Sequence, residues 1–451
     1  MGASCTVLRH GNHLLEWDTF CTAIAVLYHA DNWLLKDNML IEAVERRKMH
    51  PGNSPWYTLS IHLVHRDLRQ LSQFEEEGGK RLDFRRLLEV ASSAACRDVR
   101  DKIFALTGMM DPDITNEVTR AYSFDIPMLF ARVTKAFITR YNNLEPLRQA
   151  NPWGKLGAPT WAADWAWRGR VRESRPGTNF VGLFWNPLDP EPKPETIYSA
   201  DGRLPTCYSF LDDGRLLRCE GFIFDQVSGL GATERGDFNW ARSTMVQCPS
   251  WVSSYGGEGS TARALYSALM GGRIQQGGRV QDRHSVLQVL PSTFQTARPQ
   301  FERRGWAWMA SQGGYYFKWK RWREAHNAFM LGDRPLGQYF TDDIPRDTDE
   351  ISITEAYCAI KKMVKERRFM LTQGGRMGWA PDDMHDETGN NQVEVGDLVA
   401  IVFGCSTPLI IRRHLHSYQV VGEAYVEGVM DGEAVSLLQE GVHERESFLF
   451  E

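Results

Sequence analysis

Trp161, Asp164 and Trp165 form the pattern in this sequence that most clearly suggests chemistry, a carboxyl group between two indole rings. Aromatic rings can wall an apolar ligand, and a protonated Asp164 could donate a hydrogen bond to a polar group of that ligand. Trp379 and Tyr425 could add a further wall and a second donor. We therefore take Asp164 and Tyr425 as candidate catalytic residues, and Trp161, Trp165 and Trp379 as candidate substrate-binding residues. The alternative is a Trp-x-x-Asp loop pinned to the core.

Four acidic residues near the C-terminus offer a second possible chemistry. Glu423, Glu427, Asp431 and Glu433 could supply paired carboxylates for acid–base work. Asp431 is followed by glycine, however, and Asp-Gly is also the ordinary composition of a tight turn. The structural interpretation is the simpler one for this segment.

Other patterns that resemble reactive motifs are incomplete. His65–Leu68 imitates a kinase catalytic loop, but Ser72 stands where the required Asn should be. His414-x-His416 has no third metal ligand at a sensible spacing, and Cys405 lies among apolar residues, as a buried thiol would. No CxxC pair, phosphate loop or dinucleotide fingerprint occurs. We predict no metal and no organic cofactor.

Composition narrows the class of protein. The 451 residues are 42% hydrophobic and 24% charged, which is ordinary globular composition. A net charge of −5 argues against a nucleic-acid partner, because such proteins need a basic face. We find no signal peptide or membrane span, and the eight cysteines are scattered as in a reducing compartment. We expect a cytoplasmic protein; its oligomeric state stays open.

The elements that must position these residues change along the chain. Residues 1–150 are helical in pattern, with amphipathic segments over 17–35, 56–71 and 82–90. Asp98 is expected to cap a helix with Asp101 in its first turn. Asp125 caps the next helix, Pro127 lies in its first turn, and its apolar stripe contains Leu129, Phe130, Val133 and Phe137.

Beyond residue 150 the pattern turns to β structure. Residues 151–365 form a connection rich in Trp and Pro followed by a mixed α/β region, in which Leu216–Val227 is a strand and the Gly-rich stretches are flexible loops. Residues 366–451 contain short β-prone runs that are separated by turn signals. The expected runs are Arg368–Thr372, Leu398–Phe403, Leu409–Arg412, Tyr418–Val421 and Ala424–Val429. We predict a mixed α+β fold with a helical N-terminal part and a compact, small barrel-like C-terminal part.

Three segments resemble a known family. Arg97–Gly108 resembles the "DPRDKIYALLGL" segment that closes the domain of fungal heterokaryon-incompatibility (HET) proteins, and Pro159–Trp165 is similar to their "LPSWVPDW" motif. Arg368-Phe369, Gly396-Asp397 and the run from Val421 to Glu433 resemble the ending that these proteins share, although Glu427 stands in place of the usual His. The resemblance spans roughly residues 80–435.

The resemblance implies a regulator of fungal non-self recognition and incompatibility cell death, without catalysis. The "YxALSYxWG" segment that opens HET domains has no counterpart before Trp17, so we expect a truncated member that lacks the N-terminal HET core.

A second hypothesis comes from the many aromatic residues and the missing catalytic motifs. Unimolecular cyclisation needs a folded substrate and one or two hydrogen bonds, but no nucleophile or metal. The sequence is therefore also compatible with a cofactor-independent cyclase, similar to a Diels–Alderase or pericyclase. It would act on an apolar, unsaturated terpenoid or polyketide intermediate of fungal specialised metabolism. The sequence alone slightly favours this enzyme over the regulator.

Overall fold

The structure is a computed structural model of the 451-residue chain. It describes residues 7–10, 13–17, 19–24, 26, 84, 87–88, 91, 96–118, 122–149, 157–165, 198–235, 239–272, 319–340, 360, 363–364, 367–382 and 393–451. The chain divides into two compact units. The first contains residues 1–81, 172–179 and 298–314, and the second contains residues 82–171, 180–297 and 315–451.

In the first unit, the described residues begin with a hairpin. Strands β1 (Val7–His10) and β2 (His13–Glu16) pair antiparallel, and helical residues follow from 17 to 26. The helix predicted over 17–35 is therefore described up to residue 26. The helix predicted over 56–71, with its kinase-like His65–Leu68, lies outside the described residues.

The second unit contains the long helix that the sequence predicted. Helix α7 (Ile126–Tyr141) has Asp125 as its N-cap residue and a proline in its first turn. Its predicted apolar stripe is confirmed, because Leu129, Phe130, Val133 and Phe137 are all buried. They pack against α5 (Asp101–Phe104), α6 (Pro112–Glu117) and neighbouring segments. A left-handed Asn142 ends the helix and redirects the chain.

The helix before it begins later than predicted. Helix α5 (Asp101–Phe104) has Arg100 as its N-cap residue, so the prediction that Asp98 caps it was wrong. The carboxylate of Asp98 instead accepts the backbone N–H of Arg100 at 3.0 Å and pairs with its guanidinium at 2.7 Å. Arg100 also donates to the carbonyls of Tyr122 and Phe124, which ties α5 to the turn before α7. Asp101 does lie in the first helical turn, as predicted.

Two glycine positions cap a helix rather than form flexible loops. Gly257 is the N-cap residue of α8 (Glu258–Met270), and Gly271, with φ of 65°, ends it in the left-handed conformation. The remaining short elements of this unit are η1 (Thr107–Met109), α6 (Pro112–Glu117), η2 (Glu145–Gln149), η5 (Asp212–Gly214), β5 (Thr233–Glu234), β6 (Trp240–Ala241), η6 (Arg242–Thr244), β7 (Met330–Leu331), β8 (Arg334–Pro335), η8 (Leu336–Tyr339) and α12 (Glu433–Gln439).

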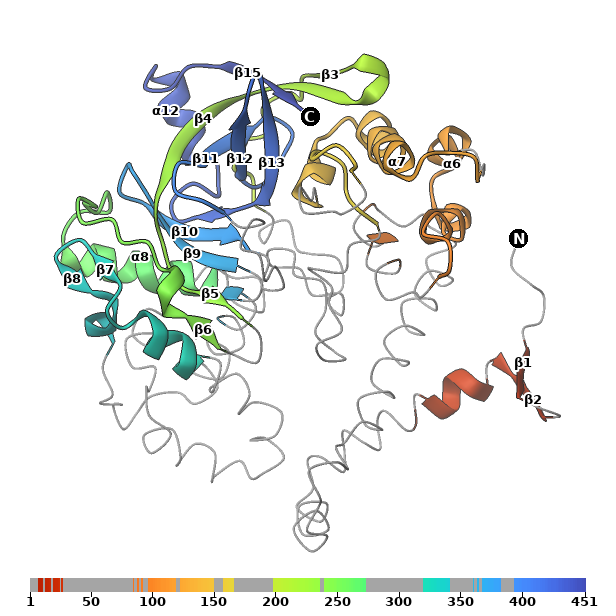
Figure 1. Ribbon diagram of the computed structural model, residues 1–451, viewed down its shortest axis with the longest axis horizontal. Coiled ribbons are helices and arrows are strands. Elements are labelled where there is room, and N and C mark those ends of the chain that lie inside the picture. The colour runs from red at the N-terminus through yellow and green to blue at the C-terminus, as the bar shows by residue number, and fades with distance from the viewer. Residues whose placement is uncertain are drawn as a thin grey trace, which may run out of the picture. The chain divides into compact units, whose positions relative to one another are not determined.

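A large sheet forms the centre of the second unit (Figure 1). Its strands are β3 (Tyr208–Leu211), β4 (Leu216–Leu230), β9 (Arg367–Thr372), β10 (Met377–Pro381), β11 (Leu398–Val402), β12 (Leu409–His414), β13 (Ser417–Glu423), β14 (Tyr425–Val426) and β15 (Glu446–Phe450). Each predicted C-terminal run and Leu216–Val227 contain a strand, although Ala424–Val429 shortens to the two residues of β14. Strands β10 and β15 were not predicted. The chain is thus a mixed α+β protein, as the sequence predicted.

Strand β4 joins the parts of this sheet. It pairs antiparallel with β3 and β15 near its start, with β11 in its middle, and with β9 at its end. At Gly221 the neighbours are so close that an added Cβ would lie 2.2 Å from the Ile401 carbonyl oxygen, so only glycine fits. Pairings run from β11 through β12, β13, β15 and β4 and return to β11.

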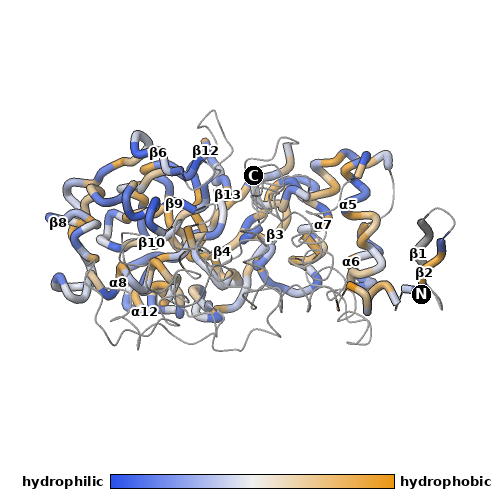
Figure 2. The backbone as a smooth tube through the Cα atoms, turned by 90° about the horizontal axis from the view of Figure 1, so that it is seen from below, coloured by the Kyte–Doolittle hydropathy of each residue, from blue (hydrophilic) through white to orange (hydrophobic). Residues whose placement is uncertain are grey.

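Apolar side chains fill the space between this sheet and α7. One hydrophobic cluster joins Leu217, Leu409 and Phe448 of the sheet with Ala131 and Ile138 of α7. Figure 2 shows apolar stretches in orange along parts of β4, β9 and the helical segments. Burial of these apolar side chains fixes α7 on the sheet. It also fixes the position of η2, which follows α7 in the chain.

Candidate functional site: a buried ion network

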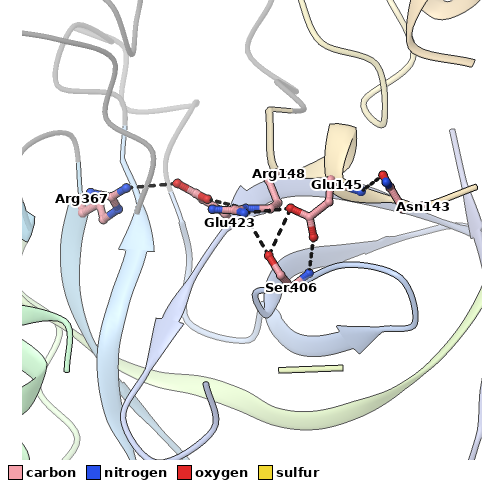
Figure 3. Close-up of polar contacts among 6 residues, drawn as sticks. All are labelled: Asn143, Glu145, Arg148, Arg367, Ser406 and Glu423. Atoms are coloured by element: carbon pink, nitrogen blue, oxygen red, sulfur yellow. Dashed lines mark hydrogen bonds and ion pairs between the residues drawn. The ribbon is translucent and has the colours of Figure 1, made fainter. Parts of the chain in front are cut away.

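Glu423 lies at the end of β13 between two arginines (Figure 3). Its Oε2 accepts a hydrogen bond from Arg148 Nε at 3.0 Å, and its Oε1 accepts one from Arg367 Nη2 at 3.1 Å. The side chains of Glu423 and Arg367 are only 1% and 4% exposed, and that of Arg148 is 12% exposed. A carboxylate this deeply buried needs such partners, since an unpaired buried charge is very costly.

Arg148 continues the network on its other side. Its Nη1 donates to Glu145 Oε2 at 2.8 Å and to Ser406 Oγ at 2.9 Å. Glu145 in turn accepts the backbone N–H of Ser406 at 2.6 Å and the hydroxyl of Ser406 at 3.1 Å. Glu145, Arg148, Arg367, Ser406 and Glu423 are called the ion network below.

Four parts of the fold position the ion network, and one of them is β13, which ends at Glu423. Glu145 and Arg148 lie on η2, directly after α7, and the backbone N–H of Leu144 donates to the Gly404 carbonyl at 2.8 Å. Ser406 lies in the loop between β11 and β12, and Arg367 begins β9. The ion network therefore connects η2, which follows the long helix α7, with strands β9 and β13 and with the loop between β11 and β12.

The same loop is held from a second side by Asp201. Its Oδ2 accepts the backbone N–H of Gly404 at 3.1 Å, and its Oδ1 accepts that of Arg203 at the same distance. Burial raises the pKa of Asp201, and these two hydrogen bonds partly oppose the rise. The loop of residues 403–408 is thus fixed from both directions.

Electrostatics favour a structural role for the ion network. Burial acts to lower the pKa of Arg148, but the charges of Glu145 and Glu423 outweigh burial and raise it. Burial, and then the charge of Glu145, raises the pKa of the neighbouring Cys405 thiol well above its usual range, so Cys405 is a poor nucleophile at neutral pH. The two arginines and two glutamates balance in charge, which suits fixing geometry more than transferring protons.

Two of the five residues singled out from the sequence lie side by side. Trp379 on β10 and Tyr425 on β14 are register partners, and both are buried. Trp379 Nε1 donates to the Ala268 carbonyl at 2.7 Å, and the Tyr425 hydroxyl donates to Glu427. Burial, followed by the charge of Glu427, raises the pKa of Tyr425 well above its usual range, so the phenol stays protonated. Glu427, the departure from the family's His, is thus its hydrogen-bond partner.

The other three residues lie in one turn but face different clusters. Trp161 packs in the cluster between α7 and the sheet, where its Nε1 donates to the Arg215 carbonyl at 3.0 Å. Trp165 packs with the helices, edge-on to Phe84 at 5.8 Å. Asp164, between them, is also buried. Their substrate-binding and catalytic roles stay predictions.

Described residues line a groove and a smaller cavity, and none of these five candidate residues is among the lining residues of either. A groove of about 680 Å³ lies between α6, α7 and η5, and a cavity of about 210 Å³ lies beside α12. Within the described part of the chain, no group of three or more His, Cys, Asp or Glu side chains is arranged to hold a metal ion. The described helices include none that is both long and apolar enough to cross a membrane.

Sequence reasoning considered Glu423 only as a possible acid–base group and did not consider Glu145, Arg148, Arg367 or Ser406 for the site. The acidic residues near the C-terminus separate in the structure: Glu423 pairs with arginines, Glu427 accepts from Tyr425, and Glu433 accepts the backbone N–H of Asp431. The available signal was Glu423 directly after Val420, Val421 and Gly422, because a charge that follows an apolar run into the core requires a buried partner.

Comparison with known families adds one finding to this geometry. Residues 280–450 match the family described as the Het-6 beta-barrel domain. The match covers β7 to β15, including Arg367, Ser406 and Glu423, whereas Glu145, Arg148 and strands β3 and β4 precede the matched residues. It supports an association of the C-terminal part with HET proteins. Neither a curated protein nor a solved structure matches the chain.

Proposed function

We propose that this chain is a HET-associated regulator of fungal non-self recognition that acts without catalysis. The match of residues 280–450 to the Het-6 beta-barrel domain carries the proposal. Pairings run from β11 through β12, β13, β15 and β4 back to β11, so a barrel-like arrangement would join matched strands with β4, which precedes the matched residues. The HET-like segment Arg97–Gly108 lies in the helical part of the same unit.

The ion network gives this proposal a physical form. Arg148, which follows the HET-like helices, is joined to Glu423 of the family-matched sheet by a buried charge pair. Two parts that are joined in this way move together, since separating them would expose buried ions without partners. We therefore expect the helical part and the sheet to act as one regulatory body.

Deletion of the gene tests the proposed function. In a fungal strain that is incompatible with a second strain through different alleles of this gene, we expect deletion to abolish death of fused cells. Uptake of a membrane-impermeant dye by fusion cells would measure death, and self-fusions would give the background. Reintroduction of the original allele should restore death. Unchanged death after deletion would contradict the proposal.

The cyclase remains a second candidate because Trp379 and the protonated Tyr425 lie together. A cyclase would place an unsaturated substrate against these side chains and direct a hydrogen bond to its carbonyl. Under this hypothesis, Tyr425→Phe should slow the cyclisation at least about tenfold, because the variant lacks the hydroxyl that donates this hydrogen bond. The measurement is the rate of product formation from a synthetic unsaturated terpenoid or polyketide substrate, with and without purified protein. Equal rates with and without protein would exclude the cyclase.

A further inference from the structure

The cavity beside α12 differs from the larger groove in the character of its lining. It is lined by Leu204, Val435, Leu438, Gln439, His443 and Arg445. Three of these side chains are aliphatic, and the other three can donate hydrogen bonds. Among the described residues, no carboxylate lines it. The cavity therefore combines aliphatic side chains with hydrogen-bond donors.

The larger groove has no such preference. Its charged residues balance, with Arg132, Lys135 and Arg140 set against acidic residues of α6 and η5. Arg140 is already paired with Asp111 at 3.1 Å and with Asp113 at 3.2 Å. Of the two sites, only the α12 cavity has a lining that would select a ligand by its charge.

Aromatic rings contact Arg445 and His443, two of the hydrogen-bond donors that line the α12 cavity. The guanidinium carbon of Arg445 lies 5.3 Å from the centre of the Phe403 ring. His443 lies 5.5 Å from the Phe222 ring and 5.4 Å from the Phe224 ring. Arg445 makes no ion pair with any residue that the structure describes, so its charge is available to a ligand.

We propose that this cavity binds a small carboxylate with a short hydrocarbon tail. The carboxylate would take the guanidinium donors of Arg445, while the tail would cover Leu204, Val435 and Leu438. The volume of about 210 Å³ is smaller than the pockets that hold drug-sized ligands, which limits the tail to about four to eight carbons. This inference does not depend on the proposed regulatory function.

Titration of the purified chain with hexanoate tests the proposal. We expect saturable binding with a dissociation constant of about 1 mM, a reasonable affinity for a ligand of about eight heavy atoms. Calorimetry would give the constant, and chemical shifts of labelled leucine and valine methyl groups would locate the ligand. Hexanol and acetate should each bind at least about tenfold more weakly, because one lacks the charge and the other lacks the tail.

A matched pair of arginine variants separates a built site from general attraction to positive charge. Arg445→Gln should weaken hexanoate binding at least about tenfold, the usual worth of one charge-assisted contact. Arg413→Gln is the control, since Arg413 is an exposed arginine that lies over Tyr418 at 5.7 Å, away from the cavity. It should leave the dissociation constant unchanged. Absence of saturation, equal affinity for hexanol, or an equal loss in both variants would overturn the proposal.

Discussion

Glu423→Gln is expected to lower the free energy of unfolding by about 3–5 kcal/mol. The amide keeps the shape of the side chain but removes the charge that Arg148 and Arg367 share. It can accept from one arginine through its oxygen, while its NH₂ group faces the other guanidinium. Arg148 then keeps Glu145 but loses its second carboxylate, and Arg367 loses its charge pair with Glu423. Urea unfolding at neutral pH, followed by circular dichroism, measures the change.

Two further variants distinguish burial from charge. Glu258→Gln removes a surface pair with Arg334, where Glu258 is 68% exposed, and should cost no more than about 1 kcal/mol. The double variant Arg367→Met with Glu423→Leu removes one cation together with the carboxylate, while Arg148 keeps Glu145. It should be more stable than Glu423→Gln, because apolar residues carry no desolvation cost. Equal losses in Glu258→Gln and Glu423→Gln would show that the ion network is not a special source of stability.

The local elements were predictable because they depend on short-range patterns. The helical spacing of Leu129, Phe130, Val133 and Phe137 predicted α7, and Asp125 marked its start. The β-prone runs after residue 366 predicted β9 and strands β11 to β14, whereas β10 and β15 were not predicted. At Asp98 the same reasoning failed, because its carboxylate is held by the side chain of Arg100 and the helix begins two residues later than a cap at Asp98 requires.

The candidate site was not predictable because its partners are far apart in the sequence. Arg148 and Glu423 are separated by 275 positions. The sequence places Glu423 directly after the apolar residues Val420 and Val421, but no local pattern names the arginines that neutralise it. Strand β4 presents the same difficulty: its existence was predicted, whereas its pairing with β9, β11 and β15 depends on the tertiary fold.

Aromatic residues illustrate a further limit. Trp161 and Trp165 are close in sequence, and this spacing fits a ligand wall as well as it fits core packing. The structure places the two rings in separate hydrophobic clusters. Which surface an indole ring covers depends on the elements packed around it, and those are distant in sequence. Composition therefore indicated that rings would be buried, but could not indicate against what.

His326 makes the stability of this chain depend on pH. The ring is 0% exposed and stacks on Trp322 at 4.3 Å. Its Nδ1 donates to the Trp322 carbonyl at 2.8 Å, and its Nε2 accepts the backbone N–H of Ala232 at 2.9 Å. Burial lowers the pKa of His326 to about 4. Protonation would remove the acceptor for Ala232 and place a charge in the core.

Between pH 6.5 and pH 4 the unfolded chain binds a proton at this position and the folded chain does not. The stabilising effect of neutral His326 is therefore fully present above pH 6.5, and about 3 kcal/mol of it is lost as pH falls to 4. In His326→Gln the amide can still accept from Ala232 but does not titrate. The difference in unfolding free energy between the original chain and this variant should thus shrink by about 3 kcal/mol over this range, because effects of all other titrating groups cancel.

His416→Gln, an exposed control, should leave the pH dependence unchanged. A constant difference between the original chain and His326→Gln from pH 7 to pH 4 would contradict a buried neutral imidazole, since such a ring must oppose protonation wherever the unfolded chain accepts it.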